Sequence, residues 1–211
     1  MTPSTRYARP LVAAPAAVLA AVVGVTTVLA AATWTVRPGG PISLTSGRLA
    51  VRDPGTGTVL SCTSSHVSGT LKHGSGLSGT GIGSVTSGSF THCNGPIWLP
   101  FTLTATGLPW HVNLTSYNAT SGEAAGNLSH AQLKLAGPSC SAVIDGTSGT
   151  ASDGIIRFTY TTSTATLTVL PKRGNLHFYN LSGCGGLFTA GDPATIGGKF
   201  SVRPKQTITS P

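Results

Sequence analysis

The sequence predicts an all-β protein folded as an antiparallel β-sandwich or flattened barrel. Three observations support this prediction: apolar and polar residues alternate along many short segments, turn-forming residues gather between those segments, and residues 33–211 offer no capped helix of ten or more residues. Alternation with a period of two is typical of strands with one buried and one solvated face. Together with the turns it indicates about nine to twelve strands.

The first element is an N-terminal targeting segment. The opening MTPSTRYARP carries two arginines and no acid, residues 11–32 are uncharged, and the stretch ends in three alanines. These are the parts of a secretory signal peptide. We expect a signal helix within residues 1–32, cleavage between Ala32 and Thr33, and secretion by a Sec-type route. The alternative is a protein anchored in the membrane through residues 11–32, which are numerous enough to span a bilayer.

The strands expected after the signal peptide follow from the alternation. In the segment IIRFTY, for example, Ile156, Phe158 and Tyr160 share one face and polar residues lie between them. The clearest segments of this kind are residues 101–107, 110–114, 131–137, 155–160 and 164–170. Near the two ends, WTVRP and FSVRP both alternate and finish with proline, which suits edge strands. We expect the two ends of the mature chain to lie in neighbouring strands.

The four cysteines fit a disulfide framework, because exported chains with an even number of cysteines usually oxidise them in pairs. The count alone allows three pairings. A weak internal repeat favours one of them, since a Ser-Cys pair opens each half and a second cysteine follows an alternating stretch. The predicted disulfides are Cys62–Cys93 and Cys140–Cys184. Each closes one of two pseudo-repeated halves, about 33–97 and 98–211, of a single domain 33–211.

His92 beside Cys93 has two competing interpretations, an activated thiol or half of a metal site. A catalytic cysteine needs a free thiolate with a lowered pKa. A zinc site needs further ligands at suitable spacing, and the chain has no C-x-x-C, H-x-x-x-H or H-E-x-x-H motif. The disulfide is therefore the favoured interpretation of Cys93.

The sequence offers little for catalysis or for a cofactor. Residues 33–211 hold only five carboxylates, and no G-x-S-x-G motif occurs. The glycine-rich stretch from Gly74 lacks the phosphate-loop pattern and a following helix. We therefore predict no catalytic, cofactor-binding or metal-binding residue. A hydrolase whose Ser-His-Asp triad comes from distant strands stays open as an alternative.

Charge is the remaining guide to partners. The full chain has a formal net charge of +8, and removal of Arg6 and Arg9 with the signal peptide leaves +6. The cations are scattered along the sequence and form no basic run with interleaved aromatics, so we expect no nucleic-acid partner. An exported basic protein is attracted to anionic cell-wall polymers or lipid head groups.

Three aromatic residues are candidates for stacking against a ligand. Trp98, Trp110 and Tyr117 fit the buried register of their expected strands, which favours packing in the core. An exposed Trp98 next to Tyr117 would instead indicate a sugar-stacking site. The predicted function is a non-enzymatic, secreted or cell-envelope β protein with a structural or interaction role. A carbohydrate- or lipid-binding module of the cell surface is the alternative, beside the hydrolase.

One resemblance extends over nearly the whole mature chain. The segments ATWTVRPGG, SCTSSHVSGTLKHGSGLSGTGIGSVTSGSFTHC, GLPWHVNLTSYNATSG, CSAVIDGT, NLHFYNLSGCGGL and QTITSP resemble a group of small secreted β-rich proteins of actinomycetes. The cysteine positions belong to the resemblance. It implies export and a β fold, and it implies no activity, ligand or catalytic residue.

Overall fold

A computed structural model describes residues 33–211. The predicted signal helix within residues 1–32, its cleavage site after Ala32 and the alternative membrane anchor at residues 11–32 lie outside the described residues. No helix within residues 33–211 is long and apolar enough to cross a membrane.

The described residues form strands and a single short 3₁₀ turn, Pro96–Trp98. The strands are β1 Thr33–Arg37, β2 Gly40–Ser46, β3 Leu49–Arg52, β4 Val59–Leu71, β5 Gly74–Ser78, β6 Gly83–Asn94, β7 Pro100–Thr106, β8 Trp110–Asn118, β9 Glu123–Ala136, β10 Ser141–Asp145, β11 Gly154–Thr161, β12 Thr166–Val169, β13 His177–Ser182, β14 Thr195–Arg203 and β15 Thr207–Thr209. Their pairings are antiparallel, which confirms the predicted all-β antiparallel class. The strands outnumber the expected nine to twelve because several, such as β3 and β15, are too short to show a clear alternation.

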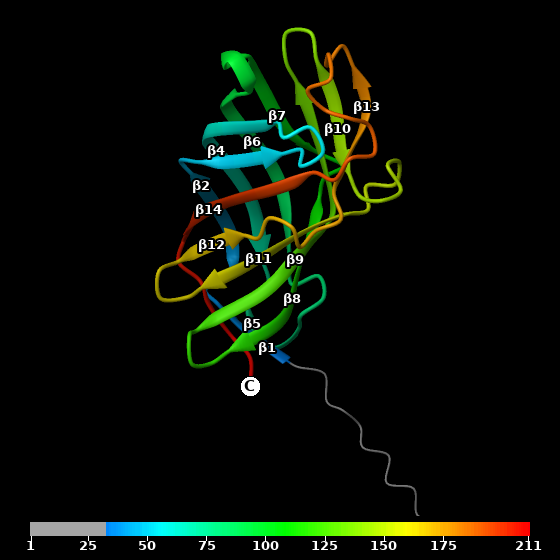
Figure 1. Cartoon of the computed structure of the whole chain (residues 1–211). Helices are drawn as coiled ribbons and strands as arrows, with labels where there is room; N and C mark the ends of the chain where they lie inside the picture. The colour runs from blue at the N-terminus through cyan, green and yellow to red at the C-terminus, as the bar shows by residue number, and fades with distance from the viewer. Residues whose placement is uncertain (1–32) are drawn as a thin grey trace, which may run out of the picture. The chain divides into compact units, whose positions relative to one another are not determined.

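Twelve strands form a large sheet that closes on itself (Figure 1). The order β11-β12-β14-β2-β4-β6-β7-β9 returns to its start because β9 also pairs with β11. Two positions in the ring are each occupied by two strands. Both β2 and β3 lie between β14 and β4, and both β7 and β8 lie between β6 and β9. β10 and β13 extend the sheet beyond β9. This closure is nearer to the expected flattened barrel than to a sandwich of two separate sheets.

A second sheet of three strands, β15-β1-β5, holds the two ends of the described chain together. Thr35 of β1 lies opposite Thr209 of β15, so the two ends occupy neighbouring strands as predicted. The expectation that WTVRP and FSVRP form edge strands was wrong, because β1 lies between β15 and β5, and FSVR belongs to β14, which pairs with β12 on one side and with β2 and β3 on the other. The strand β5 is the start of the glycine-rich stretch, and it pairs with β1.

The C-terminal segment is fastened to the ring through Gln206, which is fully buried. Its backbone N–H donates to the Tyr160 hydroxyl over 3.0 Å, and that hydroxyl donates to the Gln206 carbonyl over 2.8 Å. The Gln206 side chain accepts a hydrogen bond from the Gly39 amide and donates one to the Pro204 carbonyl. All four polar groups of Gln206 are therefore satisfied.

The inside of the ring is apolar, because alternate residues of each strand point into it. In β11, for example, Ile156, Phe158 and Tyr160 are buried and Arg157 is exposed. The side chains leave a cavity of about 100 Å³ between them. At ~24 cal/mol per Å³, an empty apolar cavity of this size costs about 2.4 kcal/mol of stability.

Both predicted disulfides are present. Cys62 and Cys93 are register partners on β4 and β6, and their bond staples these neighbouring strands directly. The bond between Cys140 and Cys184 joins the residue before β10 to the loop after β13. Two disulfides indicate an oxidising environment.

Candidate functional site

The three aromatic candidates lie in different surroundings. Trp110 is buried, and its indole N–H donates to the Thr106 carbonyl over 2.8 Å. Tyr117 is half-buried and makes an edge contact with Trp34, with ring centroids 6.5 Å apart. Trp98 is 83% exposed, so its expected place in the core was wrong.

The exposure of Trp98 follows from a tight turn between β6 and β7. Asn94 and Pro100 are opposite each other in the sheet, and the amide of Gly95 donates to the Leu99 carbonyl. The residues between are pushed outward, and strand alternation no longer decides which of them is buried. Ile97, beside Trp98, is 85% exposed for the same reason.

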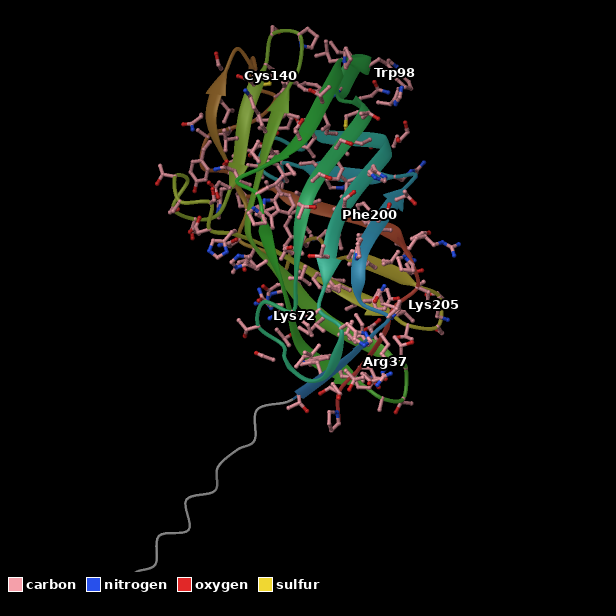
Figure 2. The ribbon with its side chains drawn as sticks, turned by 180° about the vertical axis from the view of Figure 1, so that it is seen from behind. Arg37, Lys72, Trp98, Cys140, Phe200 and Lys205 are labelled. Carbon is pink, nitrogen blue, oxygen red and sulfur yellow. A yellow bond between two sulfur atoms is a disulfide. The ribbon has the colours of Figure 1, made fainter. Side chains whose placement is uncertain are left out.

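The aromatic residues do not form a sugar-stacking platform. Trp98 lies at one end of the ring, opposite the end where Arg37 finishes β1 (Figure 2). Tyr117 packs on Trp34 of that same β1, so it belongs to the end away from Trp98. The combination that would have indicated a carbohydrate site is absent from the described residues.

The pair His92–Cys93 holds no free thiol, because Cys93 is bonded to Cys62. The described residues contain no free cysteine, and no three of their His, Cys, Asp and Glu side chains gather as a metal site would require. His92 is exposed, and its ring contacts the neighbouring Thr91 hydroxyl.

The histidines also do not complete a triad. His66 contacts the Ser68 hydroxyl at 3.4 Å, while His73 and His177 contact backbone carbonyls. His111 and His130 lie against each other, with ring centroids 4.8 Å apart. Within residues 33–211, no histidine has hydrogen bonds to both a serine and an aspartate, which is the geometry that the hydrolase alternative requires.

Cations that are scattered in the sequence gather on one side of the ring. Six of the eleven Lys and Arg residues within residues 33–211 lie on β3, β11 and β14 or in the turn after β12. The strands β11, β12 and β14 follow one another around the ring (Figure 1), and β3 pairs with β14. All six are exposed. We call this surface the basic face; its cations are Arg52, Arg157, Lys172, Arg173, Lys199 and Arg203.

Strand alternation explains why these cations point outward. In β14, Phe200 and Val202 point into the ring, so Lys199 and Arg203 must lie on the outer surface. In β3, the burial of Val51 places Arg52 outside in the same way.

Two adjoining hollows lie between the cations of the basic face. One, of about 400 Å³, has Arg157, Lys172 and His177 in its wall. The other, of about 300 Å³, has Arg52 and Lys199 in its wall. Thr195 belongs to both, and no described residue that lines either hollow carries a carboxylate.

The floor of the second hollow is made of small residues. Gly197 and Gly198 lie between Thr195 and Lys199, and Thr168 adds a hydroxyl from β12. Because glycine has no side chain, a ligand can approach the β14 backbone closely there. The second hollow therefore has a floor of small residues, cations in its wall and hydroxyl groups at its border.

The two aspartates near the basic face contact backbone amides and each other, not its cations. Asp53 is fully buried, and its carboxylate accepts hydrogen bonds from the amides of Gly55, Thr56 and Thr189. Asp192 lies against it; burial, with a contribution from the charge of Asp53 and their hydrogen bond, raises the pKa of Asp192 above its usual range. Within the described residues, no lysine or arginine forms an ion pair with a carboxylate. The cations of the basic face are therefore not paired with any carboxylate of residues 33–211.

Comparisons of the chain with protein-family models, with curated proteins and with solved structures found no match. The candidate site consequently depends on the geometry of this chain alone. Sequence analysis missed the basic face because its cations come from three strands and a turn that lie far apart in the chain. Local signals existed only in β14, where Lys199 and Arg203 are an even number of residues apart, and in the adjacent pair Lys172 and Arg173.

Proposed function

We propose that the protein is exported and acts without catalysis at the cell envelope, where the basic face binds an anionic polymer. The observation that carries this proposal is the gathering of Arg52, Arg157, Lys172 and Lys199 around two hollows that no carboxylate lines. Uncompensated positive charge attracts anions over several ångströms, and arginine and lysine are the usual partners of phosphate and carboxylate groups.

The spacing of the cations favours a polymer over a small anion. Lys199 and Arg203 are four residues apart on one strand, which separates them by about 13 Å. Arg52 lies opposite Thr195, a further four residues along β14 in the other direction. These cations, two on β14 and one on the neighbouring β3, are spaced along the direction of β14, which suits a chain that carries repeated anionic groups.

The disulfides and the sequence support the export that this proposal includes. The two disulfides are typical of chains that mature in an oxidising compartment. The signal-peptide pattern and the resemblance to small secreted proteins of actinomycetes support the same location, where anionic wall polymers are found outside the membrane. Since the described histidines lack triad geometry, we do not propose the hydrolase.

The proposal is tested by binding of the intact, oxidised protein to poly(glycerol phosphate), with dextran as an uncharged polymer and vesicles containing phosphatidylglycerol as an anionic surface. We expect binding to poly(glycerol phosphate) that weakens strongly as NaCl rises from ~50 to ~500 mM, because salt screens exposed charges. Equal binding to dextran, or no binding to poly(glycerol phosphate), would contradict the proposal. A clear preference for the vesicles would assign the face to lipid head groups instead.

A further inference from the structure

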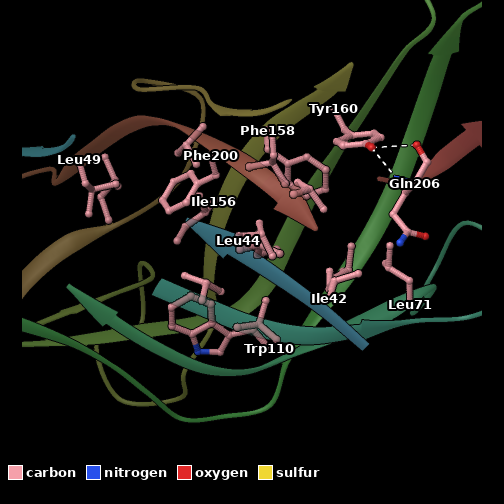
Figure 3. A pocket seen from close by; sticks show the side chains of 18 of the residues that line it. Ile42, Leu44, Leu49, Leu71, Trp110, Ile156, Phe158, Tyr160, Phe200 and Gln206 are labelled. Atoms are coloured by element: carbon pink, nitrogen blue, oxygen red, sulfur yellow. Dashed lines mark hydrogen bonds between the residues drawn. The ribbon is translucent and has the colours of Figure 1, made fainter. Parts of the chain in front are cut away.

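The cavity inside the ring has an almost completely apolar wall (Figure 3). Side chains from strands all round the ring contribute to it, among them Leu44, Phe90, Trp110, Val112, Phe158 and Val202. Three lining side chains, Ile42, Leu128 and Leu167, are only half-buried, so the apolar lining reaches toward solvent at these positions.

The two polar residues in the wall do not offer a site to water. The Tyr160 hydroxyl is held between the backbone N–H and carbonyl of Gln206, as the dashed lines in Figure 3 show. The Gln206 side chain is occupied by Gly39 and Pro204. A buried water needs two to four free polar partners, and this cavity supplies none among its described residues.

A dry apolar cavity binds small apolar molecules. A cavity of about 150 Å³ lined by leucine, isoleucine and phenylalanine takes up benzene or xenon and excludes water. The present cavity, of about 100 Å³, has the same kind of wall and adds tryptophan and tyrosine rings. Protein interiors are normally close-packed, so an apolar space of this size is unusual and is available to an apolar molecule.

We propose that the interior of the ring binds a small, uncharged, apolar molecule, of the size of a single aromatic ring or the end of a hydrocarbon chain. This site lies on the inner side of the strands that carry the basic face, and Ile156, Val169 and Ile196 border both the cavity and the hollows of the basic face. The lining of the cavity points inward, whereas Lys199 and Arg203 point outward from β14. The two proposals therefore succeed or fail independently.

Benzene is the probe, and the thermal unfolding of the intact protein is the readout. At a benzene concentration ten times its dissociation constant, the folded state gains about elevenfold over the unfolded state. We expect a rise in Tm of about 3–5 °C for a domain of this size.

Variants that fill the cavity distinguish specific occupancy from general solvent effects. Val112→Leu and Val202→Leu add one methylene each to residues that line the cavity. Val51→Leu adds the same methylene to a fully buried residue that does not line it. We expect the first two variants to keep or raise Tm without benzene and to lose most of the benzene-induced shift. The control should lower Tm without benzene, because overpacking a filled core is destabilising, and keep the shift.

Two results would overturn the inference. One is the absence of a Tm shift in the wild-type protein at benzene saturation. The other is a loss of Tm in both cavity variants as large as in Val51→Leu, because the space between the side chains would then not accept an extra methylene.

Discussion

Replacing Tyr160 by phenylalanine tests how the C-terminal segment is fastened to the ring. The hydroxyl donates to the Gln206 carbonyl and accepts from the Gln206 amide, and both residues are buried. The substitution keeps the apolar ring in the core and removes only the oxygen. Gln206 is left with a buried N–H and a buried carbonyl that have lost their partner.

The magnitude follows from the cost of unsatisfied buried groups, about 1–3 kcal/mol each. Because two groups of one residue lose their partner together, we expect Tyr160→Phe to lower the free energy of unfolding by about 2–6 kcal/mol. Tyr179 provides the matched control, since its hydroxyl also donates to a backbone carbonyl, that of Thr147, over 3.1 Å at an exposed position. Tyr179→Phe should cost less than about 1 kcal/mol, because water replaces the lost partner.

Guanidinium unfolding of the two variants measures this difference, and hydrogen exchange of the Gln206 and Ile208 amides locates it. We expect faster exchange at both amides in Tyr160→Phe only. Burial also raises the pKa of Tyr160 above 10.0, although the hydrogen bond from Gln206 offsets part of that rise. The folded state thus holds the phenolic proton more tightly than the unfolded state, so this contribution is complete below pH 10 and is lost as the pH rises above it. Equal costs for the two substitutions would refute the reasoning.

Three other predictions concern the disulfides, the exposed turn and the acid pair. Replacing Cys62 and Cys93 together by alanine should lower the free energy of unfolding by about 3.7 kcal/mol, the chain-entropy value for a separation of 31 residues, measured against the wild type in denaturant. Trp98→Ala should change stability by less than about 0.5 kcal/mol because its side chain is exposed, whereas Trp110→Ala should cost about 3–5 kcal/mol; similar losses in the two would contradict the fold around the β6–β7 turn. The pKa of Asp192 is raised chiefly by burial, so the folded state binds its proton more tightly; this contribution to stability is full below about pH 3.8 and is lost as the pH rises through the raised value. Asp192→Asn should therefore stabilise the protein at neutral pH and remove that part of the pH dependence, as thermal unfolding at several pH values will show.

The class of the fold was predictable from the sequence because alternation is a local property. The expected segments at residues 101–107 and 155–160 coincide with β7 and β11, and the inward residues of β11 are those that the alternation indicates. The disulfide partners could be predicted for a similar reason, since a repeated Ser-Cys pair opens each of the two segments that the disulfides close. The choice between a sandwich and a closed, flattened barrel could not be made from the sequence, because closure depends on β9 pairing with both β11 and β7 across large sequence separations.

The surface features were harder to predict than the core. Trp98 looked like a core residue because it follows an alternating stretch, yet a turn of a few residues interrupts the register there. The basic face could be predicted only from the order of the strands in the ring, since Arg52 and Lys199 come to the same hollow only when β3 pairs with β14. The cavity depends on how side chains of many strands fill the interior, which no local pattern specifies.

The central claim, that the basic face binds an anionic polymer, is tested most directly with two triple variants of equal charge. One replaces Arg52, Lys172 and Lys199 of the basic face by glutamine, and the other replaces three exposed cations elsewhere, Arg37, Lys72 and Lys134. Both lose one arginine and two lysines, so general attraction by net charge falls equally. The affinity of each for poly(glycerol phosphate) is then compared at one ionic strength.

At about 1 kcal/mol for each of the three cations next to an anionic surface, the first variant should bind about a hundredfold more weakly than the wild type. The second should lose less than about threefold, through long-range attraction alone. Equal losses in the two variants would contradict the account, because binding would then depend on net charge and not on the basic face.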